Sequence, residues 1–68
     1  MTKLETCFVD RYGVVCINKE EVYIDETKIS AIQISPTGTS TIKMVNDLTV
    51  YVVTSECAWK VLRMLEER

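Results

Sequence analysis

The chain has 68 residues, of which 47% are hydrophobic and 26% charged, and its formal net charge at pH 7 is −2. A chain of this length forms one domain, residues 1–68, and its apolar content excludes a disordered polypeptide. The eight basic residues are scattered along a mildly acidic sequence. This distribution argues against nucleic acid as a partner, because such binding depends on Lys and Arg side chains that neutralise phosphates.

Few residues suit a metal site or a covalent framework. The three cysteines, Cys7, Cys16 and Cys57, are too few and too widely spaced for a disulfide scaffold, and the chain contains no histidine. The opening residues are polar, which predicts no signal peptide, and no apolar run approaches the ~20 residues that span a bilayer. We therefore expect a cytoplasmic protein without membrane insertion, cofactor or metal, whose thiols act as small hydrophobic side chains.

Up to about residue 53 the chain is a succession of short apolar segments typical of β-strands. Their composition and alternation place strands at residues 7–9, 14–17, 21–25, 29–35, 41–45 and 48–53. The clearest turn is Pro36-Thr37-Gly38-Thr39, where Pro fixes φ and Gly supplies a left-handed position. All the connections are short, which predicts an antiparallel meander.

An amphipathic helix is expected over residues 56–68. Thr54 or Ser55 can cap it by accepting a hydrogen bond from an amide of the first turn, and Glu56 complements the helix dipole. Its apolar stripe consists of Ala58, Val61, Leu62 and Leu65. The sequence thus predicts an α+β domain, in which a small curved antiparallel sheet of five or six strands carries one C-terminal helix.

One helix is too small to cover both faces of such a sheet. Residues 48–53 are apolar at almost every position, with Tyr51 and Val53 on one face and Val50 on the other. Either the sheet curls and buries both sides, or one face meets another chain. The marginal stability of small domains favours self-association or a partner protein. Because Trp, Tyr and Arg are enriched in interface hot spots, the predicted contact surface consists of Trp59, Arg63, Tyr51 and Tyr23.

The sequence holds no arrangement typical of an enzyme. The adjacent carboxylates Glu20-Glu21 and Asp25-Glu26 flank one short strand and are expected to be solvated turn charges. Cys57 lies near a helix N-terminus, which favours its thiolate, but the chain has no histidine with which to form a Cys–His pair. No catalytic residue is predicted.

The turn Pro36-Thr37-Gly38-Thr39, with Ser40 after it, is rich in hydroxyl groups and is the basis of an alternative function. Its backbone amides and hydroxyl groups could bind a small anionic ligand, and a homodimer could pair two such turns around a nucleotide or cyclic nucleotide. The chain would then be a ligand-sequestering or ligand-sensing domain. The candidate residues are Thr37, Gly38, Thr39, Ser40 and Lys43.

Residues 22–65 resemble the small FlbD/SwrD-type flagellar-motility proteins. Those proteins pair an apolar strand with an I-x-x-I-x-x-x-P segment, followed by a turn, an I-x-L-like strand, an Asn-Gly turn, a Val-rich strand and a helix. Ile29, Ile32 and Pro36 reproduce the first spacing here, and Asn46-Asp47 stands where the Asn-Gly turn would be. The resemblance implies this architecture and carries over no catalytic motif.

These observations together favour a non-enzymatic interaction protein. We expect a small regulator that docks on another protein and acts as a homodimer. Phage-encoded inhibitors of host machinery are one class of protein with this size and character. The ligand-binding domain is the alternative.

Overall fold

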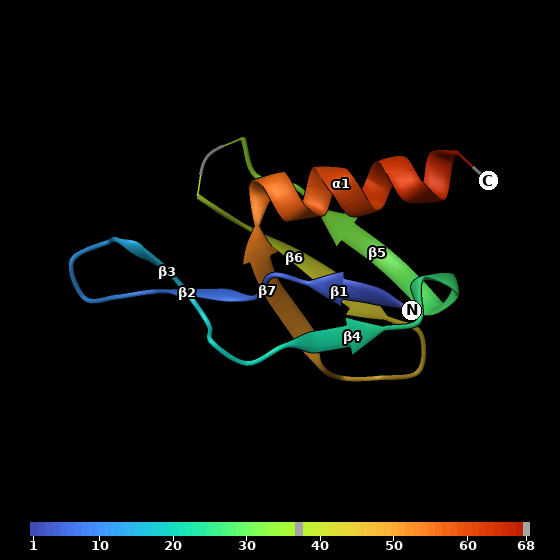
Figure 1. Cartoon of the computed structure of the whole chain (residues 1–68), viewed down its shortest axis with the longest axis horizontal. Coiled ribbons are helices and arrows are strands. Elements are labelled where there is room, and N and C mark those ends of the chain that lie inside the picture. The colour runs from blue at the N-terminus through green and yellow to red at the C-terminus, as the bar shows by residue number, and fades with distance from the viewer. Residues whose placement is uncertain (37, 68) are drawn as a thin grey trace.

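The computed structural model describes residues 1–36 and 38–67, and Figure 1 shows their fold. Within these residues the elements are β1 Thr2–Leu4, β2 Cys7–Val9, β3 Val15–Ile17, β4 Val22–Ile24, η1 Glu26–Lys28 (a single 3-10 turn), β5 Ile29–Gln33, β6 Thr39–Met44, β7 Val50–Thr54 and α1 Ser55–Glu66. Antiparallel strands are thus followed by one C-terminal helix. The predicted α+β class is confirmed.

The strands of the described residues form three small antiparallel sheets in place of the single meander that was expected. β5, β6 and β7 form a three-stranded meander, β2 and β3 form a hairpin, and β1 pairs with β4 across that hairpin. The sequence pattern did not indicate β1, because its only large apolar residue is Leu4. Its pairing with β4 places Leu4 opposite Val22, a contact that no local pattern reveals.

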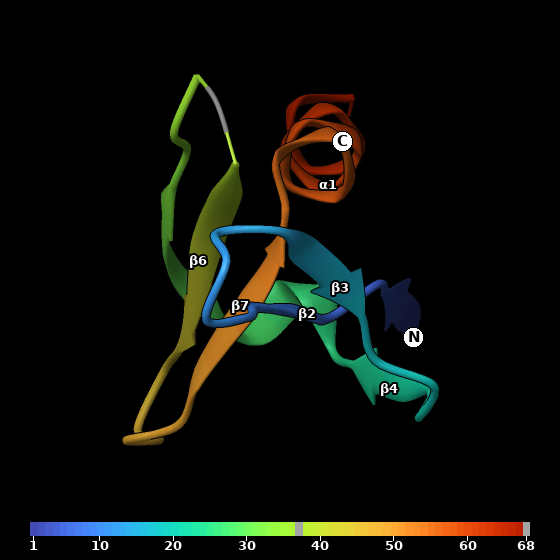
Figure 2. The ribbon, with the colours of Figure 1, turned by 90° about the vertical axis from the view of Figure 1, so that its left-hand side faces the viewer.

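The core lies between α1, the inner face of the β5–β6–β7 sheet and the β1–β4 pair. Figure 2 shows α1 end-on, above the space between these two sheets. The β1–β4 pair covers the part of the sheet that one helix leaves open, so the inner face needs no second chain to bury it. The buried cluster consists of Leu4, Ile24, Ile42, Val53, Ala58 and Val61.

The helix α1 begins one residue earlier than expected, at Ser55, and its cap is Thr54. The Thr54 hydroxyl accepts a hydrogen bond from the Cys57 amide at 3.1 Å, which satisfies one of the free donors of the first turn. The predicted stripe faces the core, with Ala58 and Val61 buried. Arg68, the last residue of the predicted helix, lies outside the described residues. No helical segment of the described chain has the length and hydropathy to cross a bilayer.

The three thiols are free and differ in their surroundings. Cys7 is buried, and this burial raises the pKa of its thiol, with Cys57 and Glu5 adding to the effect. Because the thiolate is the reactive form, we expect iodoacetamide to alkylate Cys7 more slowly than the half-buried Cys16 at mildly alkaline pH. Peptide mass spectrometry over time measures both rates. Urea should abolish the difference, and equal rates in the folded protein would contradict the burial of Cys7.

Candidate protein-interaction surface

The β2–β3 hairpin projects from the rest of the molecule (Figure 1). Its base is attached to the body through Thr6, which forms an isolated antiparallel bridge with Val53 at the edge of β7. Asn18 closes the base from the other strand: its amide N–H donates to the Thr6 carbonyl at 2.9 Å and its side chain to the Thr6 hydroxyl at 3.1 Å. Beyond this point the hairpin pairs Cys7 with Ile17, Phe8 with Cys16 and Val9 with Val15.

The tip of the hairpin is an ordered turn organised by Asp10. Its carboxylate accepts hydrogen bonds from the amides of Tyr12 at 2.8 Å and Val14 at 2.9 Å. The Asp10 amide donates to the Val14 carbonyl at 3.0 Å, and Gly13 turns the chain with a φ of 79°. The hairpin therefore keeps a defined shape although it extends away from the core.

Asp10→Ala is expected to loosen this tip. Two amides would lose their shared acceptor, at a cost of about 1–2 kcal/mol in the free energy of local opening. Amide hydrogen exchange of Tyr12 and Val14 should accelerate about tenfold or more, while amides in α1 keep their protection. Asp10→Asn is the matched control because it retains an acceptor oxygen, and it should have the smaller effect. Equal exchange in Asp10→Ala and the wild type would contradict the capping role.

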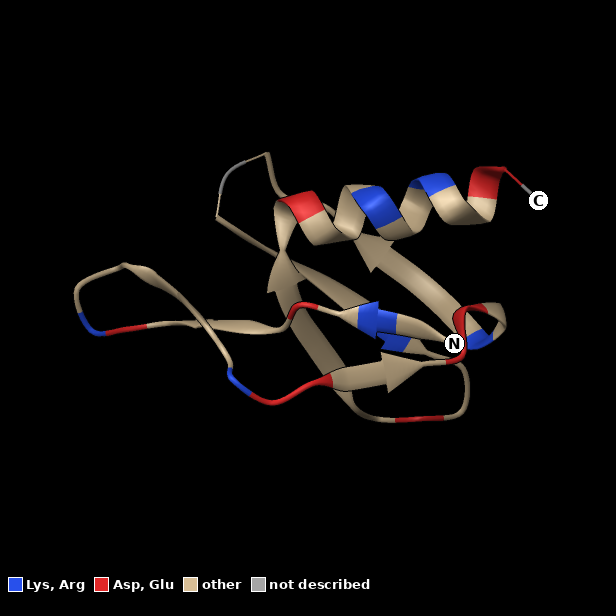
Figure 3. Ribbon diagram, in the orientation of Figure 1, with Lys and Arg blue, Asp and Glu red and all other residues tan. Residues whose placement is uncertain are grey.

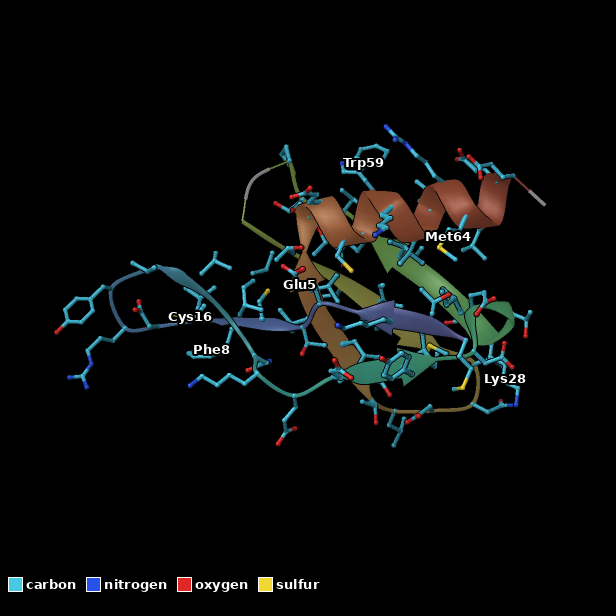
Figure 4. The ribbon with its side chains drawn as sticks, viewed as in Figure 1. Glu5, Phe8, Cys16, Lys28, Trp59 and Met64 are labelled. Carbon is cyan, nitrogen blue, oxygen red and sulfur yellow. The ribbon has the colours of Figure 1, made fainter. Side chains whose placement is uncertain are left out.

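The hairpin carries large apolar side chains in contact with solvent. Tyr12 at the tip is 81% exposed and Phe8 on β2 is 50% exposed, while β2 and β3 contain no charged residue. Phe8 and Cys16 share one face of the hairpin, as Figure 4 shows, and Val9 lies on the other. The exposed apolar set comprises Phe8, Val9, Tyr12, Val14, Val15 and Ile17. Apolar side chains gathered on one projecting element are typical of an interaction site.

The four residues predicted as a contact surface do not lie together. Trp59 and Arg63 line the outer surface of α1 with Met64, and the Trp59 side chain points away from the sheets (Figure 4). Tyr23 lies on the outer face of the β1–β4 pair, where its hydroxyl donates to the Glu21 carboxylate at 3.2 Å. Tyr51 is half-buried and packs against the core. Only the first two therefore share a surface.

The sequence contained one sign of the hairpin surface. Residues 14–17 are apolar on both faces, a pattern that predicts a strand but leaves open what covers it. The structure places residues 15–17 in a two-stranded sheet with β2, and Val14, which directly precedes β3, is 55% exposed. Residue type indicated the apolar segment, but the sheet to which it belongs decided its exposure.

The hydroxyl-rich turn is occupied by its own hydrogen bonds. Ser40 is buried, and its hydroxyl accepts from the Ser35 amide at 3.0 Å and bonds with the Ser55 hydroxyl at 3.0 Å. Ser55 also donates toward the carbonyl of Gly38, which has the expected left-handed φ of 81°. Lys43 lies on the outer face of β6, whereas Ser40 is on the inner face. Thr39 shares the outer face with Lys43, and Thr37 lies outside the described residues.

The distribution of charged residues indicates no other candidate site among the described residues. Acidic and basic residues are interspersed over the ribbon in Figure 3 without a region of one sign. Within residues 1–36 and 38–67, no group of three or more Cys, Asp or Glu side chains is arranged to hold a metal ion. The hairpin is thus the feature of the described chain that most resembles a functional surface.

No protein-family model, no curated protein and no solved structure matches this chain. The resemblance to FlbD/SwrD-type proteins stays a prediction.

Proposed function

We propose that this chain is a small non-enzymatic protein-interaction module, a regulator that acts by docking on another protein through its β2–β3 hairpin. The supporting observation is the concentration of half-exposed apolar side chains on a projecting and internally ordered element. Burial of such side chains on association is favourable by roughly 25 cal/mol per Å² of apolar surface. A hairpin whose strands lack charges also avoids the cost of desolvating an unpaired ion.

Phe8 and Tyr12 are the proposed anchors of the contact. Aromatic side chains supply a large buried area with little loss of rotamer freedom, which is why they dominate binding hot spots. The Arg11 guanidinium lies 5.8 Å from the centre of the Tyr12 ring, so the tip combines an apolar surface with a positive charge. Trp59 and Arg63 on the outer surface of α1 form a second, smaller candidate contact.

Co-purification from the native cell tests this proposal. The tagged wild type should retain a specific protein that the double variant Phe8→Ser, Tyr12→Ser fails to retain. Leu48→Ser is the matched control, because Leu48 is equally apolar and fully exposed but lies in the β6–β7 connection. Retention by all three proteins would show that the hairpin is not the contact surface. If the wild type retains no protein at all, the interaction function is wrong.

The ligand-binding alternative has weaker support, because the Ser40 hydroxyl is committed to Ser35 and Ser55. We expect no thermal shift with nucleotides or cyclic dinucleotides. A true ligand at a hundredfold excess over its dissociation constant would stabilise the fold by ~2.7 kcal/mol, which a thermal scan detects readily. A shift that Lys43→Ala abolishes would instead favour the ligand-binding function.

A further inference from the structure

We propose that the free edge of β3 pairs with β3 of a second copy of this chain, antiparallel and centred on Cys16. The inference rests on the proposed interaction function and names the occupant of one edge of the same hairpin. The exposed side chains of Phe8 and Tyr12 remain available for another protein. The result would be a dimer with a four-stranded ribbon, in the order β2, β3, β3, β2.

The bonding pattern of the hairpin fixes the direction of the backbone N–H and C=O groups of β3. In an antiparallel ladder, hydrogen-bonded pairs alternate with pairs that share no bond. The bonds from Asp10 to Val14 at 3.0 Å and from Asn18 to Thr6 at 2.9 Å mark two of the bonded positions in this hairpin. The alternation between them directs the N–H and C=O groups of Val15 and Ile17 away from β2. Among the described strands β3 has β2 as its sole neighbour, so these groups form an open edge.

The edge of β3 lacks the features that normally prevent a strand from pairing with another chain. Edge strands normally avoid pairing with other chains by carrying Lys or Pro, or by containing a bulge. The sequence of β3 is Val-Cys-Ile, and its pairing with β2 shows a continuous register. The nearest charged residues are Asp10 and Arg11 at the tip and Lys19 at the base. An uncharged, regular edge of this kind is a template for strand addition.

A second copy of this chain fits the open edge of β3. With Cys16 on the two-fold axis, Val15 of each copy lies opposite Ile17 of the other, and both residues have outward-directed backbone groups. Every outward group of β3 then finds a partner. The same axis brings the tip of each copy, which carries Arg11, toward the base of the other, which carries Glu20 and Glu21, so that opposite charges approach each other at both ends of the ribbon. The chain thus supplies its own complementary edge.

The position of Cys16 makes the register measurable. Cys16 would face its own symmetry mate in a pair without hydrogen bonds, where Cα atoms lie about 4.5 Å apart. A disulfide spans Cα separations of roughly 4.4–6.8 Å, so the two sulfur atoms could be joined. Cys16 is a free, half-buried thiol in the single chain.

Mild oxidation of the full-length protein tests the register. Diamide takes two electrons and two protons from a pair of thiols and leaves a disulfide. The expected product is a covalent dimer linked between the two Cys16 residues, identified by mass spectrometry of a non-reduced digest. Cys16→Ser should give no such link, while sedimentation of this variant under reducing conditions should still show a dimer. A wild-type link through another cysteine, or no link, would overturn the register.

Two further variants test the edge itself. Cys16→Lys places two like charges at the two-fold axis, and it should raise the dimer dissociation constant by about tenfold or more. Ile17→Pro removes an outward-directed N–H and leaves the bonds to β2 in place, and it should have a similar effect. Circular dichroism checks that both variants remain folded. A wild type that sediments as a monomer, or a dimer unaffected by both variants, would contradict the pairing.

The β3 pairing and the docking surface can each be refuted by experiment without the other. A monomeric wild type that still retains its partner protein through Phe8 and Tyr12 would overturn the β3 pairing alone. A dimer linked at Cys16 whose partner binding ignores Phe8 and Tyr12 would overturn the docking surface and leave the pairing intact.

Discussion

Leu4→Ala is expected to destabilise the protein by about 2–5 kcal/mol. Leu4 is 1% exposed and is the residue through which β1 enters the core. Its truncation would leave a cavity between β4, α1 and the main sheet, which close-packed surroundings fill only in part. Domains of this size have total stabilities of only several kcal/mol, so a large share of the molecules should unfold. Urea denaturation followed by circular dichroism measures the loss.

Leu48→Ala is the matched control for this experiment. The chemical change is identical, but Leu48 is fully exposed, so the free energy of unfolding should change by no more than about 0.5 kcal/mol. Equal losses at the two positions would mean that β1 is not part of the core. The comparison therefore tests the one strand that the sequence pattern did not indicate.

Ser40→Ala is expected to cost about 1–3 kcal/mol, because it removes a buried hydroxyl that bonds with two half-buried groups. The Ser35 amide would lose its acceptor, and the Ser55 hydroxyl would lose one of its bonds. These bonds connect the turn before β6 to the first residue of α1. Thermal unfolding measures the effect, and Ser30→Ala is the control because Ser30 is exposed on β5.

Ser55→Ala provides the coupling test for this cluster. Ser55 donates to the Ser35 carbonyl at 2.9 Å and shares a bond with Ser40, so the two substitutions remove overlapping interactions. The double variant Ser40→Ala, Ser55→Ala should lose less stability than the sum of the single variants. Additive losses would show that the two hydroxyls act independently.

Most of the secondary structure could be predicted from residues that are close together in the sequence. The cap at Thr54 and the stripe with Ala58 and Val61 predicted the helix, since both depend on residues within a few positions of one another. Six strand segments were also placed to within a few residues. The grouping of strands into sheets was not predictable, because it depends on the pairing of β1 with β4 and of Thr6 with Val53, which are distant in sequence.

The same limit applies to the candidate surface. Tyr51 and Trp59 were selected by residue type, yet Tyr51 packs on the core and Trp59 points to solvent. Which face of a strand is covered depends on the element that packs there, and β1 was the missing element. Phe8 and Tyr12 were not predicted as contact residues, because nothing in their local sequence indicates that the hairpin projects. The free edge of β3 likewise appears only when the strand order is known.

The pairing of β1 with β4 also makes the hairpin an insertion between two paired strands. Leu4 and Val22 lie opposite each other at the point where the chain leaves one strand and enters the other. A tight turn of two to five residues could join them directly, as in ordinary hairpins. The segment proposed to contact other molecules thus lies between two strands that pair with each other directly.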